Sequence, residues 1–126
     1  MPKTILPVTS APPAMGPYSV LTEANGFVFM SGQIGLDPAT GATVPGGVEE
    51  QAHQVMRNIG AILGDVGLVY DDIIKTTIFL ANMADFAAVN TVYAGYIGDA
   101  RPARSTVEVA ALPGGHLVEI ELIAAR

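Results

Sequence analysis

Cysteine is absent from the 126 residues of this chain, and its absence excludes three kinds of chemistry. A chain without cysteine forms no disulfides, binds no metal through thiolates and has no cysteine nucleophile. Its two histidines, His53 and His116, are too far apart to match a zinc-binding spacing. The sequence therefore predicts neither a metal site nor thiol chemistry.

Charged residues are also scarce. Asp, Glu, Lys and Arg make up 14% of the chain, against about 25% in an average soluble domain. Half of the residues are hydrophobic, so one small domain has too few charges to cover its surface evenly. We therefore expect part of the surface to be buried against further copies of the chain.

Positive charge is scarcer still, because 6 Lys and Arg stand against 12 Asp and Glu, for a net charge of −6. Binding to a nucleic acid backbone normally depends on many Lys and Arg contacts, so no nucleic acid partner is expected. Long apolar runs are missing too, both at the N-terminus, where a signal peptide would lie, and in any window of membrane-spanning length. The default expectation is a soluble cytoplasmic protein that does not bind membranes.

The length fits a single domain over residues 1–126, and the hydrophobic pattern predicts its elements. Residues 7–18 are rich in proline and predict an ordered extended loop. We expect strands over 27–34, 73–80, 104–110 and 117–124, helices over 48–66 and 85–97, and a hairpin-like turn over 37–41. With a second strand completing the hairpin-like turn, the predicted order β-β-α-β-α-β-β indicates an α+β fold with two helices on one face of a mixed sheet.

Arg104 is the most informative of the basic residues. It stands at the mouth of an otherwise apolar strand, where the fork of guanidinium donors suits a planar carboxylate or a phosphate. If Val107 and Val109 face the helices, strand alternation places Arg104 on the opposite face, together with Thr106 and Glu108. The sequence therefore predicts a site for a small anion on that face.

The last predicted strand carries two carboxylates with the same parity. Val118, Ile120 and Leu122 form its apolar face towards the helices, so Glu119 and Glu121 are expected on the opposite face. If this strand pairs with the strand of Arg104, the arginine and one of the glutamates share one site.

Seven short motifs follow one another at compatible spacing. They are Gly16-Pro17-Tyr18-Ser19, Ser31-Gly32-Gln33-Ile34, Asp37-Pro38-Ala39-Thr40-Gly41, Lys75-Thr76-Thr77-Ile78-Phe79-Leu80, Val89-Asn90-Thr91-Val92-Tyr93, Pro102-Ala103-Arg104-Ser105 and Val118-Glu119-Ile120-Glu121. Any one of them alone is a weak signal. Together they resemble the reactive-intermediate deaminase family (Rid, RidA/YjgF), over nearly the whole chain.

This resemblance implies a chorismate-mutase-like α+β fold and a homotrimer with three active sites in the clefts between subunits. It also implies a hydrolase that converts reactive 2-imino acids, such as 2-iminobutanoate or 2-iminopropanoate, to 2-oxo acids and ammonia. The imine carbon is already electrophilic when its nitrogen is protonated, so positioning is the main task and no metal or organic cofactor is required.

The resemblance also assigns roles to residues. Arg104 would clamp the substrate carboxylate and Glu119 would position the attacking water. The remaining residues that it implies around the substrate are Tyr18, Ser31, Gly32 and Asn90. Thr106 stands where many deaminases carry a cysteine, and its hydroxyl can still line the pocket.

Arg101 is the main departure from the family pattern, because many members have an aromatic residue at this position. It adds a second positive charge close to the expected clamp and leaves the substrate preference open.

Plainer interpretations stay open for several residues. Arg104 can be one half of a surface ion pair, with Glu108 or Glu121 as its partner. The plainer interpretation of Lys75 is a charge on the surface of its strand. His53 would be solvated on the polar side of its helix, and His116 would belong to a turn.

Other functions stay open as well. The alternatives are deamination of a different enamine by another Rid branch, a ribonuclease or translation inhibitor, and a trimer that binds a small carboxylate without catalysis.

Overall fold

The two helices begin and end close to the predicted positions. In the computed structural model, which describes residues 2–126, α1 spans Val48–Asp65 and α2 spans Phe86–Ile97. The backbone N–H of Gly47 donates to Oε1 of Glu50 at 2.7 Å, which satisfies one of the amides that a helix start leaves without partners. Met1, the first residue of the expected domain, lies outside the described residues.

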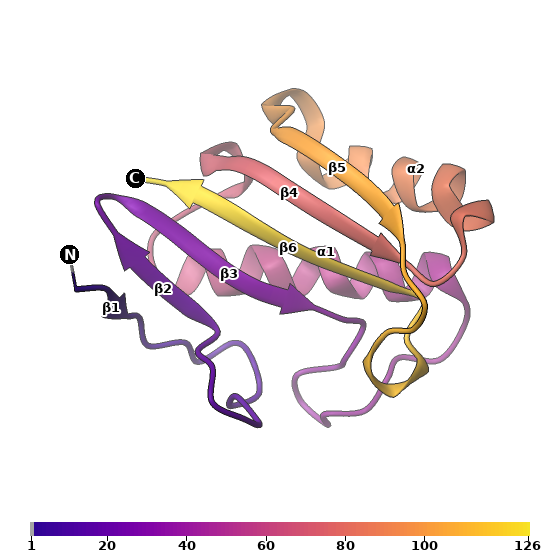
Figure 1. The fold of residues 1–126 in the computed structure, drawn as a ribbon, viewed down its shortest axis with the longest axis horizontal. Helices are drawn as coiled ribbons and strands as arrows, with labels where there is room; N and C mark the ends of the chain where they lie inside the picture. The colour runs from indigo at the N-terminus through magenta and orange to yellow at the C-terminus, as the bar shows by residue number, and fades with distance from the viewer. Residues whose placement is uncertain (1) are drawn as a thin grey trace.

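Six strands form a single sheet. They are β1 (Thr4–Ile5), β2 (Leu21–Ala24), β3 (Phe27–Gln33), β4 (Ile73–Leu80), β5 (Ala103–Glu108) and β6 (Val118–Ala125), in the spatial order β1-β2-β3-β6-β4-β5. β4 and β5 run parallel and every other neighbouring pair is antiparallel, so the sheet is mixed as expected. Figure 1 shows both helices on the same side of this sheet, which confirms the predicted α+β architecture.

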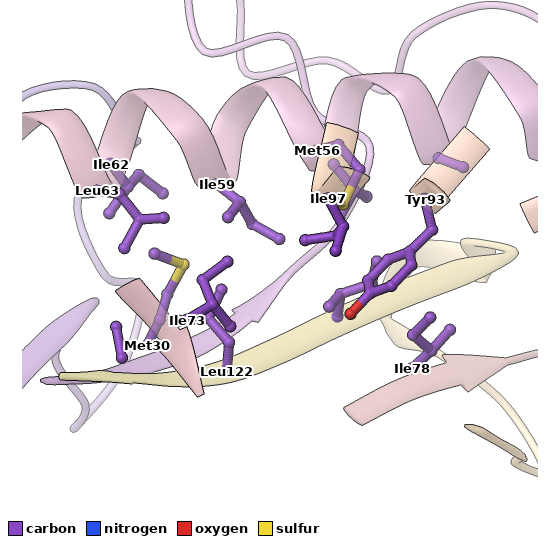
Figure 2. Close-up of a cluster of buried hydrophobic side chains, with 14 of the residues drawn as sticks. Met30, Met56, Ile59, Ile62, Leu63, Ile73, Ile78, Tyr93, Ile97 and Leu122 are labelled. Carbon is purple, nitrogen blue, oxygen red and sulfur yellow. The ribbon is translucent and has the colours of Figure 1, made fainter. Parts of the chain in front are cut away.

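The core lies between the helices and the face of the sheet that they cover. Side chains repeat along α1 at helical spacing, and those of Ile59, Ile62 and Leu63 are almost fully buried. Figure 2 shows them between α1 and the strands that carry Met30 and Leu122. Burial of each such side chain stabilises the fold by about 1.5–3 kcal/mol relative to exposure.

The N-terminal part of the sheet adds two strands that the pattern did not locate, β1 and β2. Asn25 and Gly26 connect β2 to β3 with φ angles of 53° and 80°. Two successive positive φ angles are typical of a type I′ hairpin turn, which favours the Asn-Gly pair. The expected turn over 37–41 is confirmed, since the N–H of Gly41 donates to the carbonyl of Asp37 at 2.7 Å.

The strand of Arg104 shows the opposite parity to the one expected. Across the sheet, Arg104 on β5 pairs with Thr76 on β4, and Thr76 in turn pairs with Leu122 on β6. Thr76 and Leu122 are buried under the helices, so Arg104 points to the helix side. Val107 is 41% exposed and lies on the other face. The prediction was wrong because on this edge strand the polar side chains face the helices and the apolar Val107 faces away from them.

The two site strands do not pair, so the condition set for a site shared within one chain is not met. β4 lies between β5 and β6 and pairs with both of them. The parity of β6 itself is as predicted, because Val118, Ile120 and Leu122 are buried under the helices.

The face of the sheet that the helices leave open is partly apolar. Phe27 and Phe29 of β3 are each 44% exposed there, beside Ile123 of β6 and across the sheet from Val107. Side chains of this size at such exposure form the kind of patch that proteins bury against partners.

Neither helix of residues 2–126 combines the length and the apolar character that crossing a membrane requires.

Candidate active site

Glu119 forms the centre of one group of predicted site residues. It lies on β6 and borders a cavity of about 210 Å³ that the proline-rich loop and the end of β3 enclose. Tyr18, Ser31 and Gly32 line the same cavity. Four of the predicted site residues therefore meet in one place.

Gly32 allows the backbone of β3 to approach the Glu119 carboxylate. A Cβ atom on Gly32 would lie 2.7 Å from Cδ of Glu119 and 3.0 Å from its Cγ. Carbon atoms in proteins do not approach one another this closely, because attraction between them is best at about 3.5–4.0 Å. A residue without a side chain is therefore required at position 32 for Glu119 to hold its position. The resemblance had instead placed Gly32 at the site because its backbone could approach a ligand.

Ser31 and Tyr18 are linked to Glu119 through the local backbone. The Ser31 hydroxyl donates to the carbonyl of Ser19 at 2.6 Å, which ties β3 to the segment that carries Tyr18. The β3–β6 register shifts between Met30 and Gln33, next to Ser31, as at a β-bulge. The Tyr18 side chain is 55% exposed and so is accessible to a ligand in the cavity.

The surroundings of Glu119 change its acidity. Desolvation by burial raises the pKa of its carboxyl above the ordinary value, and the nearby charge of Glu121 raises this pKa further. His116 acts in the opposite direction and lowers it. A carboxyl group with a raised pKa is better suited to exchange protons near neutral pH than an ordinary glutamate.

Arg104 forms the centre of a second group, which lies between β5 and α2. Nη1 of its guanidinium donates to Oδ1 of Asn90 at 2.6 Å. The guanidinium carbon lies 5.2 Å from the centre of the Tyr93 ring and 5.7 Å from that of Phe86, within the range of cation–π attraction. These contacts hold the guanidinium in one orientation at the border of a cavity of about 330 Å³, which Asn90 and Tyr93 also line.

Thr106 lies two residues beyond Arg104 on the same helix-facing side of β5, where it pairs with buried Ile78 of β4. Its hydroxyl oxygen is buried and has no hydrogen-bond partner among residues 2–126. A buried hydroxyl without a partner costs about 1–3 kcal/mol. Whether this hydroxyl contacts a substrate stays a prediction.

The two groups face opposite sides of the sheet within one chain. Glu119 pairs with Phe79, and Phe79 pairs with Val107, along the open face. Arg104 belongs to the row of Thr76 and Leu122 on the helix side. Consequently a single chain does not bring the guanidinium and the carboxylate to one substrate, contrary to the expectation of a shared face.

Comparison with known proteins decides the family. A family model described as endoribonuclease L-PSP matches residues 8–126. The chain belongs to this family. It is 45% identical over 124 residues to the 2-iminobutanoate/2-iminopropanoate deaminase of Mus musculus, an alignment that covers 98% of this chain and 92% of the mouse protein.

Solved structures agree with this assignment. A Rid-family protein of Yersinia pestis, YyfA, is 47% identical, with a TM-score of 0.94 over 99% of this chain and 100% of that one. TdcF of E. coli, solved with bound serine, is 40% identical, with a TM-score of 0.90 over 98% of each chain. The resemblance to the Rid family is confirmed.

Three residues of this Rid-family site were missed by sequence reasoning. Phe86 and Tyr93 lie in the apolar stripe of α2, which predicts core packing and hides their contact with Arg104. His116 follows a glycine-rich turn, yet its side chain is only 4% exposed. Its Nδ1 lies 2.7 Å from the carbonyl of Pro113, and its Nε2 lies 3.0 Å from the hydroxyl of Thr43.

The plainer interpretations have mixed outcomes. Glu108 is not the partner of Arg104, because its Oε1 accepts from the N–H of Met83 at 2.7 Å. His53 is partly buried and lies 2.9 Å from the hydroxyl of Tyr96, so the expectation of a solvated side chain was wrong. Across residues 2–126, no cluster of three or more metal-ligating side chains occurs.

Proposed function

We propose that this protein hydrolyses reactive 2-imino acids, of the 2-iminobutanoate and 2-iminopropanoate type, to 2-oxo acids and ammonia. One observation carries the proposal. A chain with 45% identity to a deaminase of this name holds a guanidinium with free donors in one cavity and a carboxyl of raised pKa in another. The two groups match the two needs of the reaction, a carboxylate clamp and a water-directing base.

Arg104 acts as the clamp. Its bond to Asn90 uses one of five guanidinium N–H donors, so the others remain free to form two parallel hydrogen bonds with the substrate carboxylate. Cation–π contacts with Tyr93 and Phe86 hold the guanidinium in place before the substrate arrives. This preorganisation lowers the entropic cost of binding the imino acid in one orientation.

Glu119 acts on water. A water oxygen forms a bond to the imine carbon while the Glu119 carboxylate accepts one of its protons, which yields a carbinolamine. The same carboxyl then returns the proton to the amine nitrogen and the C–N bond breaks. As the C=O bond forms, the carboxylate takes the hydroxyl proton and passes it to the departing ammonia, which leaves as ammonium. The raised pKa suits both steps, because the group must gain and lose a proton within one turnover.

Tyr18, Ser31 and Gly32 shape the water side of the site, and Asn90 and Thr106 shape the carboxylate side. The mechanism uses no cofactor, since the protonated imine supplies the electrophile.

A homotrimer with active sites between its subunits brings the two sides together. A contact between the Arg104 edge of one subunit and the open sheet face of the next is heterologous, and such contacts close into rings when the rotation permits. The exposed Phe27, Phe29 and Val107 support this proposal, because subunit contact would bury them. The number of three subunits rests on the family resemblance.

The first test is removal of the clamp. An amino-acid oxidase acting on alanine supplies 2-iminopropanoate, and its loss is followed with and without the protein. Arg104→Ala should lower kcat/KM about 100-fold or more, because two charge-assisted hydrogen bonds are lost. Arg57→Ala is the matched control, since it removes the same charge from an exposed site on α1. Wild-type rates in the Arg104 variant, with the oligomer intact, would disprove the clamp.

Co-expression of two inactive variants tests the shared site. In a mixed ring, a chain with Arg104→Ala still supplies Glu119, and a chain with Glu119→Gln still supplies Arg104. If each site takes one residue from each neighbour, random assembly of equal amounts restores about one quarter of the sites, following ring geometry. Sites built within one chain would restore none, and that result would refute the proposed assembly.

A second candidate has a specific observation in its favour, since the matching family model is described as an endoribonuclease. The net charge of −6 argues against an RNA substrate. Salt-sensitive RNA binding, together with RNA cleavage that Glu119→Gln abolishes, would favour this candidate over the deaminase. The same variant distinguishes the deaminase from a trimer that only binds carboxylates. Glu119→Gln of a deaminase should keep 2-oxobutanoate binding and lose turnover.

A further inference from the structure

Arg101 and Arg104 border the same cavity. This cavity, of about 330 Å³, lies where α2 ends and the chain enters β5. Arg104 occupies its β5 side, and Arg101 lies on the connecting segment that precedes β5. The other residues that line it are Asn90, Tyr93, Ala94, Ile97, Gly98 and Pro102, none of which is acidic.

Neither guanidinium has a carboxylate partner. Within the described chain, residues 2–126, the single ion pair joins Arg126 to Glu23 at 2.8 Å. Asp99 lies two positions before Arg101 and forms no ion pair with it. Two uncompensated positive charges at one cavity are unusual in a chain with a net charge of −6. Their repulsion is relieved most fully by a ligand that carries two negative charges.

The backbone at Arg101 supports a role for this side chain. Arg101 has φ 42° and ψ 60°, in the left-handed region that residues other than glycine and asparagine rarely adopt. Pro102 follows directly, and a proline disfavours the right-handed helical conformation for the residue before it. Glycine would fit this position without strain, yet the chain carries an arginine.

We propose that Arg101 forms a second anion subsite, so that the preferred substrates are 2-imino acids with an anionic side chain, such as 2-imino dicarboxylates. The α-carboxylate binds Arg104, the side-chain carboxylate binds Arg101, and the methylene groups between them contact the apolar wall formed by Ala94 and Ile97. This inference rests on the proposed function. It defines the substrate class and leaves the reaction at the imine carbon unchanged.

The test compares two imino acids in the intact protein. Oxidases acting on glutamate and alanine supply 2-iminoglutarate and 2-iminopropanoate, and kcat/KM is measured for each. We expect the wild type to favour 2-iminoglutarate. Arg101→Ala should lower the ratio of kcat/KM for 2-iminoglutarate to kcat/KM for 2-iminopropanoate about tenfold. This is the low end of what one charge-assisted hydrogen bond contributes, because Arg101 is exposed.

Two further variants separate a subsite from general charge. Arg57→Ala removes the same charge from α1 and should leave the ratio at its wild-type value. Arg101→Lys keeps the charge and should retain a large part of the preference. High salt should reduce the preference in the wild type, because the subsite is exposed. An equal ratio in the wild type, Arg101→Ala and Arg57→Ala would overturn the proposal.

A binding measurement distinguishes this inference from the proposed function. Calorimetry compares 2-oxoglutarate with 2-oxobutanoate, the products of the two imine classes. If the wild type hydrolyses neither imino acid, the deaminase proposal is wrong, and binding alone then decides the subsite. Tighter binding of 2-oxoglutarate that Arg101→Ala abolishes supports the second anion site, and equal binding of the two acids refutes it.

Discussion

Replacing Gly32 with alanine adds one carbon atom at the point where β3 passes closest to Glu119. The new Cβ would lie 2.7 Å from Cδ of the carboxylate and 3.0 Å from Cγ. Ordinary carbon contacts begin near 3.5 Å, so the carboxyl group must move by roughly 1 Å. Misplacement of a catalytic group by this distance costs about 100-fold in rate. We therefore expect kcat for 2-iminopropanoate to fall about 100-fold in Gly32→Ala.

Stability should change much less than activity in this variant. Overpacking a rigid core costs about 1–3 kcal/mol, but here the displaced atoms belong to the end of a flexible side chain. We expect a loss in the free energy of unfolding near the low end of this range, measured by urea denaturation.

Gly64→Ala is the matched control for Gly32→Ala. No atom lies within 4 Å of a Cβ at Gly64 near the end of α1, so activity should be unchanged and stability should rise slightly. Full activity in Gly32→Ala would refute the argument that this glycine positions Glu119.

Two further predictions concern Glu119 and the loop before β6. Desolvation is the main reason why the pKa of Glu119 in the folded chain lies above its ordinary value of 4.5. Between 4.5 and the raised pKa, the folded chain therefore binds more protons than the unfolded chain. The free energy of unfolding should fall as pH rises through that interval. In that interval, urea unfolding at several pH values should show a weaker dependence of the unfolding free energy on pH in Glu119→Gln than in the wild type. An unchanged dependence would contradict the raised pKa. Thr43→Val removes the hydroxyl that lies 3.0 Å from Nε2 of His116 and should destabilise the fold by about 1 kcal/mol. A Tm equal to that of the wild type would show that this contact contributes nothing.

Much of the fold could be predicted because its signals are local. The apolar stripe of α1 predicted a helix over 48–66, against Val48–Asp65 in the structure, and the β-rich run over 73–80 is β4 itself. β1 was missed because two residues carry no periodicity, and β2 because its four residues are too few to reveal one.

The site was only partly predictable because contacts between distant elements are absent from local patterns. The motifs of this family predicted Arg104 and Asn90 separately, but the 2.6 Å hydrogen bond between them depends on how α2 lies against β5. The role of Gly32 against Glu119 depends on the β3–β6 register in the same way.

The error at β5 has a physical cause that bears on the function. Strand alternation divides the side chains of β5 between two faces, but it does not say which of the two faces the helices cover. On β5 the helix side receives Arg104 and Thr106 and the open side receives Val107, because the parallel register with β4 overrides side-chain polarity. An apolar residue on the open face and a guanidinium on the helix face are both costly for an isolated subunit. Both are explained if the open face of one subunit covers the Arg104 edge of the next, which is the arrangement that the co-expression experiment tests.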